Sequence, residues 1–125
     1  MVAFNFQKEF AAAILSGDKR QTIRRTMRCK PGAGLQLYTG MRTKTCTKIT
    51  DAVCTDVWPI ILHPHSVEAG GGWIRADEDL DKFARADGFA DFIEMIAWFD
   101  RVHGLPFEGW LHQWIPSDKC NEGKE

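Results

Sequence analysis

Three stretches of the chain alternate apolar and polar side chains, which is the pattern of a half-buried β-strand. They lie around Phe4 and Phe6, around Leu35 and Leu37, and at residues 107–115. Two further stretches, 22–26 and 43–58, are rich in threonine, isoleucine and valine, which favour extended backbone. The second is long enough for one long strand or two consecutive strands. We expect prolines 59 and 64 to limit its extent.

Apolar side chains recur at helical spacing in three other stretches. They lie at residues 7–16, between Asp77 and Asp87, and at residues 90–103. Gly17, Gly88 and Gly104 follow these stretches, and glycine is a common residue just past a helix end. Asp77 is the expected N-cap of the second helix. The third helix carries a broad apolar stripe that we expect to pack on the sheet. Its members include Ile93, Met95, Trp98, Phe99 and Val102.

One predicted helix comes early in the chain and two come late, so helices and strands do not alternate regularly. This order predicts an α+β fold, a small curved sheet or barrel with helices across its openings. The length of 125 residues and the 44% of apolar residues suit a single compact domain. We expect the domain to span residues 1–115 and the polar stretch 116–125 to be a tail.

The sequence shows neither a membrane span nor an export signal. No apolar run approaches the roughly 20 residues that a bilayer-spanning helix needs. The first residues, MVAFNFQKEF, lack the basic stretch, apolar region and cleavage site of a secretory signal. We therefore expect a cytoplasmic protein with no membrane partner and with free cysteine thiols. The cysteines are Cys29, Cys46, Cys54 and Cys120.

A metal site and a cofactor site are not expected. His63 and His65 follow Cys54 in the sequence, but no second pair of ligands stands at the spacing of a zinc site. A solvated loop bent by Pro64 explains the two histidines without a metal. The three glycines at 70–72 lack the spacing of a dinucleotide-binding loop and the lysine of a phosphate-binding loop.

Charge is divided unequally along the chain. Residues 1–50 hold ten lysines and arginines and two acidic residues, whereas residues 51–125 hold six basic and fifteen acidic residues. The basic cluster in residues 19–30 predicts a partner that carries phosphate or another anion. A solvated face neutralised by the acidic half of the chain is the alternative. The cluster consists of Lys19, Arg20, Arg24, Arg25, Arg28 and Lys30.

The segment that follows the first helix gathers three polar groups. Lys19 lies on the turn after Gly17, and Thr22 and Arg24 stand two residues apart in a strand, so they share one face. A lysine near a hydroxyl can bind an anion. It can also raise the nucleophilicity of the hydroxyl if burial lowers the lysine pKa. A solvated basic turn is the alternative at this point.

The pattern Gly17-x-Lys19-x-x-Thr22-x-Arg24 after a short amphipathic helix resembles the ASCH domains, relatives of the PUA RNA-binding domain. The resemblance covers about residues 4–115. It continues in KPG (30–32), LQLYTG (35–40), ADGF (86–89) and Phe107-x-Gly109-Trp110. It implies a small, mostly antiparallel PUA-like β-barrel flanked by helices.

The resemblance also implies a function close to RNA. ASCH domains are thought to bind RNA, and one bacterial branch of similar size hydrolyses N4-acetylcytidine with a lysine, a threonine and a glutamate. Lys19 and Thr22 match the first two residues by motif. The glutamate opens a helix in that branch, which indicates Glu94, or Asp91 if the register differs by three residues.

Three hypotheses of function follow. In the first, Lys19 takes the proton of Thr22, Thr22 attacks an acyl carbon, and Glu94 passes a proton to the leaving amine. In the second, the chain is a non-catalytic RNA-binding module in which an aromatic side chain stacks on an unpaired base. A ribonuclease-like hydrolase is the third. The expected ligand-binding residues of the basic cluster are Arg20, Arg24, Arg25 and Arg28.

Overall fold

The structure is a computed structural model that describes residues 2–117. The strands are β1 (Val2–Phe6), β2 (Gln21–Arg24), β3 (Gly34–Thr39), β4 (Thr47–Leu62), β5 (Val67–Ala69), β6 (Gly72–Ile74) and β7 (Phe107–Pro116). The helices are a 3-10 turn (Lys8–Phe10), α1 (Ala11–Ser16), α2 (Asp77–Ala86) and α3 (Phe92–Val102). Of the expected polar tail at 116–125, residue 116 belongs to β7 and residues 118–125 lie outside the described part of the chain.

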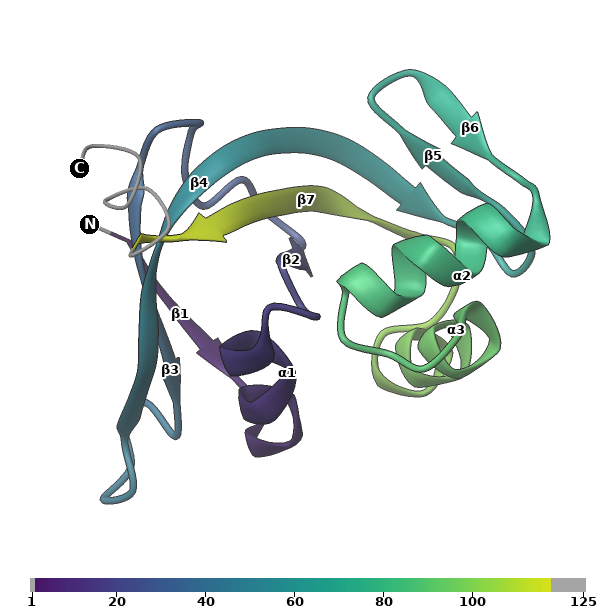
Figure 1. The fold of residues 1–125 in the computed structure, drawn as a ribbon. Coiled ribbons are helices and arrows are strands. Elements are labelled where there is room, and N and C mark those ends of the chain that lie inside the picture. Colours follow the sequence, from purple (N-terminus) through teal and green to yellow (C-terminus); the bar gives the residue numbers. More distant parts are fainter. Residues whose placement is uncertain (1, 118–125) are drawn as a thin grey trace.

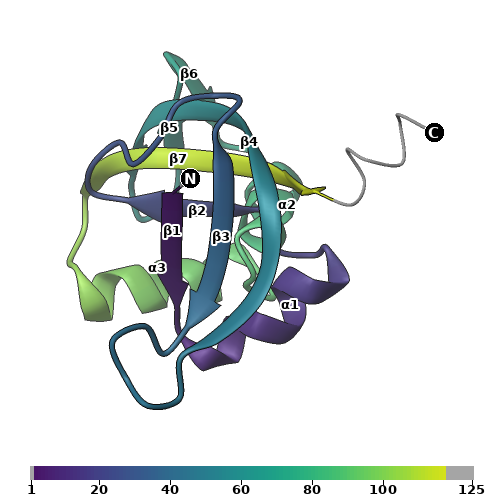
Figure 2. The same ribbon diagram turned by 90° about the vertical axis from the view of Figure 1, so that its left-hand side faces the viewer.

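The strands form one mixed sheet that curls into a half-barrel (Figures 1 and 2). β1 pairs in parallel with β3, and the other strand pairs of the described residues are antiparallel. The long strands β4 and β7 arch over the molecule, with α1 on one side and α2 and α3 on the other (Figure 1). The expected α+β class, a curved and mostly antiparallel sheet flanked by helices, is confirmed.

β4 runs through Pro59, where the sequence led us to expect the strand to end. The carbonyl oxygen of Pro59 accepts a hydrogen bond from the Gly70 N–H at 3.0 Å, just beyond the end of β5. The proline nitrogen faces that same side of the strand, and the pairing of β4 with β5 begins only at Ile60. The proline removes only the reciprocal bond to the Gly70 carbonyl oxygen, beyond the last residue of β5, so it is tolerated within the strand.

The helix ends agree with the glycines of the sequence. Gly17, Gly88 and Gly104 all have positive φ angles, which lets the chain turn back after each helix. The start of α2 differs from the prediction, because Ala76 is the N-cap and Asp77 is already helical. Three acidic residues in the first turn of α2 favour this start electrostatically without a side-chain cap.

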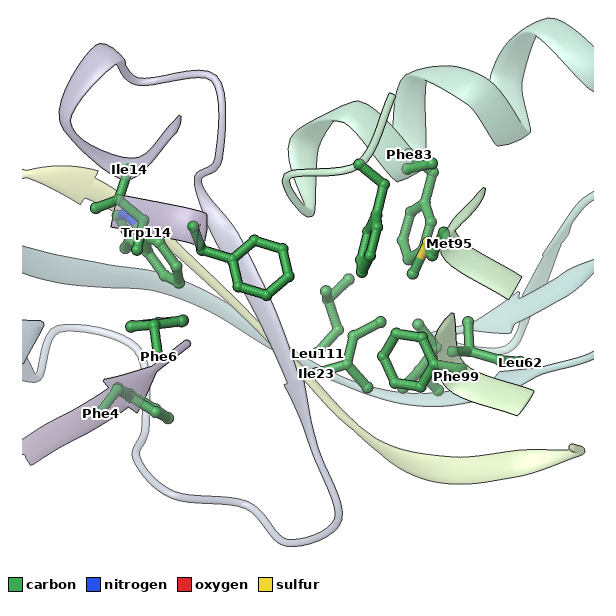
Figure 3. Close-up of a cluster of buried hydrophobic side chains, with 14 of the residues drawn as sticks. Phe4, Phe6, Ile14, Ile23, Leu62, Phe83, Met95, Phe99, Leu111 and Trp114 are labelled. Carbon is green, nitrogen blue, oxygen red and sulfur yellow. The ribbon is translucent and has the colours of Figure 1, made fainter. Parts of the chain in front are cut away.

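The hydrophobic core extends from β1 and α1 to α2 and α3, and β2 runs through it (Figure 3). Ile23 of β2 pairs in register with Leu111 of β7, and both side chains are buried. Phe99 of α3 packs on this core as expected, but Ile93 is 81% exposed. Among the described strands, β2 pairs only with β7, yet it is covered by the core, so its polar side chains Gln21 and Thr22 are buried.

The described residues bear on two expectations from the sequence, the lack of a membrane-spanning helix and the free cysteine thiols. Within residues 2–117, none of the helices combines the length and the apolar character that crossing a membrane requires. Cys29, Cys46 and Cys54 carry free thiols. Cys120 lies outside the described residues.

Candidate functional site

A cavity of about 320 Å³ opens between the end of β1, strand β2 and helix α3. Its size is at the lower end of the range typical of small-molecule sites, ~300–1,000 Å³. Aromatic rings form most of its apolar wall: Phe6, Phe10, Phe89, Trp98, Phe99 and Phe107. Its polar wall contains Asn5, Gln7, Lys19, Thr22, Arg24, Arg25 and Asp87. The cavity therefore joins an aromatic surface to a cluster of charged groups.

Lys19 is buried in this wall, with 3% of the residue exposed. Its Nζ donates hydrogen bonds to the carbonyl oxygens of Gln21 at 2.8 Å and of Asp87 at 2.5 Å. The ring centroids of Phe6 and Phe10 lie 5.5 and 4.9 Å from Nζ. Burial lowers the pKa of Lys19 from 10.5 to about 8, although the charge of Asp87 acts in the opposite direction.

Two hydrogen bonds leave one position on the Lys19 amino group. A neutral amine has two N–H groups, which satisfy the two carbonyl oxygens, and one lone pair that can accept a proton. The protonated amine has a third N–H, and the Asp87 carboxylate is 3.9 Å away, beyond hydrogen-bond distance. Both protonation states of Lys19 are therefore accommodated, and a lysine with this pKa can exchange a proton near neutral pH.

Asp87 is the acidic group of the site, and the sequence did not single it out. It lies at the end of α2 with 3% of the residue exposed, and its Oδ1 accepts a hydrogen bond from Gln21 Nε2 at 3.4 Å. Burial raises the pKa of Asp87 to about 6, against the favourable charge of Lys19. Its spacing from Phe83 and Ala84, on the buried face of α2, was the signal available in the sequence.

Thr22 and Arg24 share a face of β2, as their spacing predicted. Arg24 Nε donates to Thr22 Oγ1 at 3.1 Å, and Arg24 Nη2 donates to the Asn5 carbonyl oxygen at 2.9 Å. The guanidinium lies 5.1 Å from the ring centroid of Phe6, which helps to fix its position. Because Thr22 Oγ1 accepts from Arg24, its own O–H remains free to donate. Burial and the charge of Arg28 lower the pKa of Arg24 to about 10.

The remaining arginines of the basic cluster are divided between two surfaces. Arg25 lines the cavity, with its guanidinium 4.9 Å from the ring centroid of Phe107. Arg28 does not line it, but its Nη2 donates to the Ala3 carbonyl oxygen at 3.2 Å. Arg20 faces a different groove, at the ends of α1 and α2. The structure therefore brings Arg24 and Arg25 to the cavity and leaves Arg20 and Arg28 outside its lining.

Glu94, the predicted acid, is not at the cavity. It is exposed in the first turn of α3, where its Oε2 accepts the Ala90 N–H at 3.2 Å. Asp91 is the N-cap of the same helix, and its Oδ1 accepts the Glu94 N–H at 2.8 Å. Asp91 thus supplies the N-cap half of a capping box, and Glu94 reaches back to the N–H of Ala90, one residue before the N-cap. Neither Glu94 nor the alternative Asp91 is among the residues that line the cavity. Both carboxylates serve the start of the helix.

Aromatic residues that the sequence placed in the core also shape the site. Trp98 packs on the core, yet it lines the cavity with its ring centroid 6.3 Å from that of Phe10. His103, which no sequence pattern singled out, stands 5.9 Å from Trp98 at the rim. Burial and the charge of Arg25 lower the pKa of His103, which favours its neutral form.

Of the two histidines beside Pro64, His63 has other partners. His63 stacks on Trp73 with 5.6 Å between ring centroids, and its Nε2 lies 3.0 Å from Glu68 Oε2. Within the part of the chain that the structure describes, no three His, Cys, Asp or Glu side chains are grouped to hold a metal ion.

Comparison of the chain with family models, with curated proteins and with solved structures gives no match. A functional assignment for this protein rests on its own residues and geometry.

Proposed function

We propose that the cavity binds the base of a modified nucleoside, free or within RNA, and hydrolyses an acyl amide on that base. N4-acetylcytidine is the first substrate to test, because the Gly17-to-Arg24 motif resembles that of ASCH domains. The observation that carries the proposal is the convergence of Lys19, Thr22 and Asp87 on one cavity with aromatic walls.

The wall of the cavity suits a planar, uncharged ring. A base presents a π face, and stacking on an aromatic side chain is worth ~1–3 kcal/mol per base. Trp98 of α3 and Phe10 of the 3-10 turn, whose rings meet edge to face, both contribute aromatic surface to this wall. Hydrogen bonds from the polar wall can then read the edge of the base. Arg24 and Arg25 line the same cavity and supply positive charge that can stabilise a phosphate or a developing oxyanion.

The chemistry is an acyl transfer in two steps. Neutral Lys19 takes the proton of Thr22, and Thr22 Oγ1 bonds to the acyl carbon while Arg24 stabilises the oxyanion. The bond from carbon to N4 then breaks, and the Lys19 ammonium returns its proton to the leaving amine. Water then attacks the acyl carbon while Lys19 takes its proton; the bond to Thr22 Oγ1 breaks, the carboxylic acid is released, and Lys19 returns the proton to Thr22. Asp87 is the carboxylate of this site, but its role differs from the one expected of Glu94: its charge raises the Lys19 pKa, and Lys19 itself delivers the proton to the leaving amine.

Replacement of the Thr22 hydroxyl tests the proposal most directly. Thr22→Val keeps the shape of a buried side chain but removes the nucleophile, so we expect turnover of N4-acetylcytidine to fall by at least about 1,000-fold. Thr39→Val is the matched control, because Thr39 is buried in β3 and does not line the cavity. The control should retain turnover within about twofold in a chromatographic assay. Turnover by Thr22→Val at the rate of the control excludes Thr22 as nucleophile.

Binding without catalysis is the second candidate, and one observation favours it. Thr22 Oγ1 already accepts a hydrogen bond from Arg24, and the Lys19 amino group already donates to two carbonyl oxygens. In that case the wild-type protein binds N4-acetylcytidine without releasing cytidine. Thr22→Val then changes the affinity by no more than one neutral hydrogen bond, ~0.5–1.5 kcal/mol. Calorimetry beside the turnover assay separates the two functions.

A further inference from the structure

A second groove, of about 650 Å³, adjoins the cavity at Phe89, which lines both. The end of α1 forms one wall and the end of α2 forms the other, and these two ends face each other in Figure 1. The Arg20 N–H donates to the Ala86 carbonyl oxygen at 2.8 Å and so links the two walls. The groove is thus a fixed feature of the surface next to the candidate site.

The groove carries a net positive charge. Arg20, Lys82 and Arg85 line it and are exposed, and Asp18 is the acidic residue in its lining. Among the residues that the structure describes, none of the three cations forms a salt bridge. Three cations against one carboxylate leave an unneutralised charge that attracts an anion.

Stabilisation of the helix ends does not account for these cations. Basic side chains near a helix C-terminus can bond the last carbonyl groups. Here backbone N–H groups already do so, since Gly17 bonds the Ile14 carbonyl oxygen and Gly88 bonds that of Arg85. The cationic side chains appear in no hydrogen bond of the described residues. They are available to a ligand in the groove.

We propose that this groove binds the phosphodiester backbone of single-stranded RNA whose neighbouring base occupies the cavity. The inference rests on the proposed function and names its substrate as a polynucleotide rather than a free nucleoside. Phe89 lies between the aromatic cavity, which suits a flat base, and the cationic groove, which suits an anion. A single strand of RNA presents a base and the neighbouring phosphate at such adjacent positions. An acidic peptide matches the charge of the groove but supplies no base for the aromatic cavity.

The experiment compares a pentanucleotide with a nucleoside. UUCUU RNA and free cytidine serve as probes, because neither is hydrolysed in the proposed reaction. The groove variant combines Arg20→Gln, Lys82→Gln and Arg85→Gln. The control combines Arg42→Gln, Lys44→Gln and Arg101→Gln, which are exposed and line neither the cavity nor the groove. Binding is followed by calorimetry between low and high salt, and thermal unfolding confirms that both variants are folded.

We expect the wild-type protein to bind UUCUU at least tenfold more tightly than cytidine. The groove variant should bind UUCUU at least tenfold more weakly than wild type. Its slope of log K against log salt should become shallower by ~0.7 for each phosphate that the groove no longer neutralises. Its affinity for cytidine should stay within twofold of wild type. The control should keep most of the affinity for UUCUU.

Three results overturn the groove as an RNA site: equal affinity of wild type for the two probes, equal losses in the groove and control variants, or equally effective competition by a polyglutamate peptide. The last result assigns the groove to an acidic protein partner. Failure of the proposed reaction is a separate result, because it appears as absent turnover of N4-acetylcytidine while the groove variant still weakens UUCUU binding.

Discussion

Two carboxylates that lie seven residues apart in the chain have opposite environments. Asp87, at the end of α2, is 3% exposed and lies beside the buried amino group of Lys19. Glu94, in the first turn of α3, is exposed and bonds a backbone N–H of its own helix. Burial raises the pKa of Asp87 to about 6 and couples it to Lys19. The comparison shows that the packing around an acid, rather than its residue type or its nearness to a helix, decides its chemistry.

The glycines that follow α2 and α3, Gly88 and Gly104, also have opposite environments, one packed and one open. A side chain at Gly88 meets Lys19 Cδ at 2.9 Å and the Phe10 ring at 3.0 Å, whereas nothing lies within 4 Å of a side chain at Gly104. Both glycines have a positive φ. The end of α2 is thus packed against the candidate site, and the end of α3 is open.

Substitution of these glycines by alanine should give the largest change in the free energy of unfolding. Gly104→Ala costs only the backbone strain of a positive φ, ~1–2 kcal/mol. Gly88→Ala adds overpacking of ~1–3 kcal/mol, so we expect a total loss of about 3 kcal/mol in the free energy of unfolding. It also displaces Lys19 and reduces turnover. Urea denaturation measures both variants, and equal losses at the two positions contradict the close packing of Gly88 on the site.

Removal of the negative charge of Asp87 tests whether this carboxylate sets the pKa of Lys19. Turnover that needs neutral Lys19 rises with pH through about 8, because burial has lowered the Lys19 pKa to that value. The charge of Asp87 raises this pKa, so Asp87→Asn lowers it further and moves the rise of turnover to lower pH. An opposite charge at this range is worth ~1 pKa unit or more. Asp87 is itself half protonated near pH 6, so the comparison is made at pH 7, where its carboxylate is charged. Turnover at pH 7 relative to pH 9 should increase at least about threefold.

Glu94→Gln is the matched control for that experiment. A glutamine oxygen still accepts the Ala90 N–H, and no contact joins Glu94 to Lys19. The pH dependence of turnover should therefore be that of the wild-type protein. A shift in Glu94→Gln equal to that in Asp87→Asn assigns the catalytic acid to α3, as the sequence suggested, and removes the distinction between the two carboxylates.

Local patterns in the sequence predicted much of the fold. Alternation located β1, β3 and β7, and glycines located the ends of all three α-helices. Pro59 misled the prediction, because the strand continues through it by pairing with β7, and the missing N–H costs one bond beyond the end of β5. The short strand β5 carries no alternation of its own, since it has three residues and forms by pairing with β4.

In the candidate site, too, local patterns predicted some of the residues and tertiary packing determines the others. Thr22 and Arg24 were placed together by a spacing of two residues, and the structure confirms their contact. Asp87 reaches Lys19 across 68 residues of chain, and only the docking of α2 against β2 brings them together. Glu94 matched the local pattern of a helix-opening acid, and that pattern is equally typical of a capping box. Short-range spacing therefore identified one half of the site, and tertiary packing supplies the other.

The smallest expected effect concerns the cap of α3. Asp91→Ala removes the acceptor of the Glu94 N–H, and loss of an N-cap costs about 1 kcal/mol in the free energy of unfolding. Asp91→Asn keeps an acceptor at the same place and should be within a few tenths of a kcal/mol of wild type. Neither change should move the pH dependence of turnover, because Asp91 serves the backbone of α3 and not Lys19. Urea denaturation and the turnover assay measure the two properties independently. A shifted pH profile in Asp91→Ala couples the start of α3 to Lys19 and contradicts the separation of the two carboxylates.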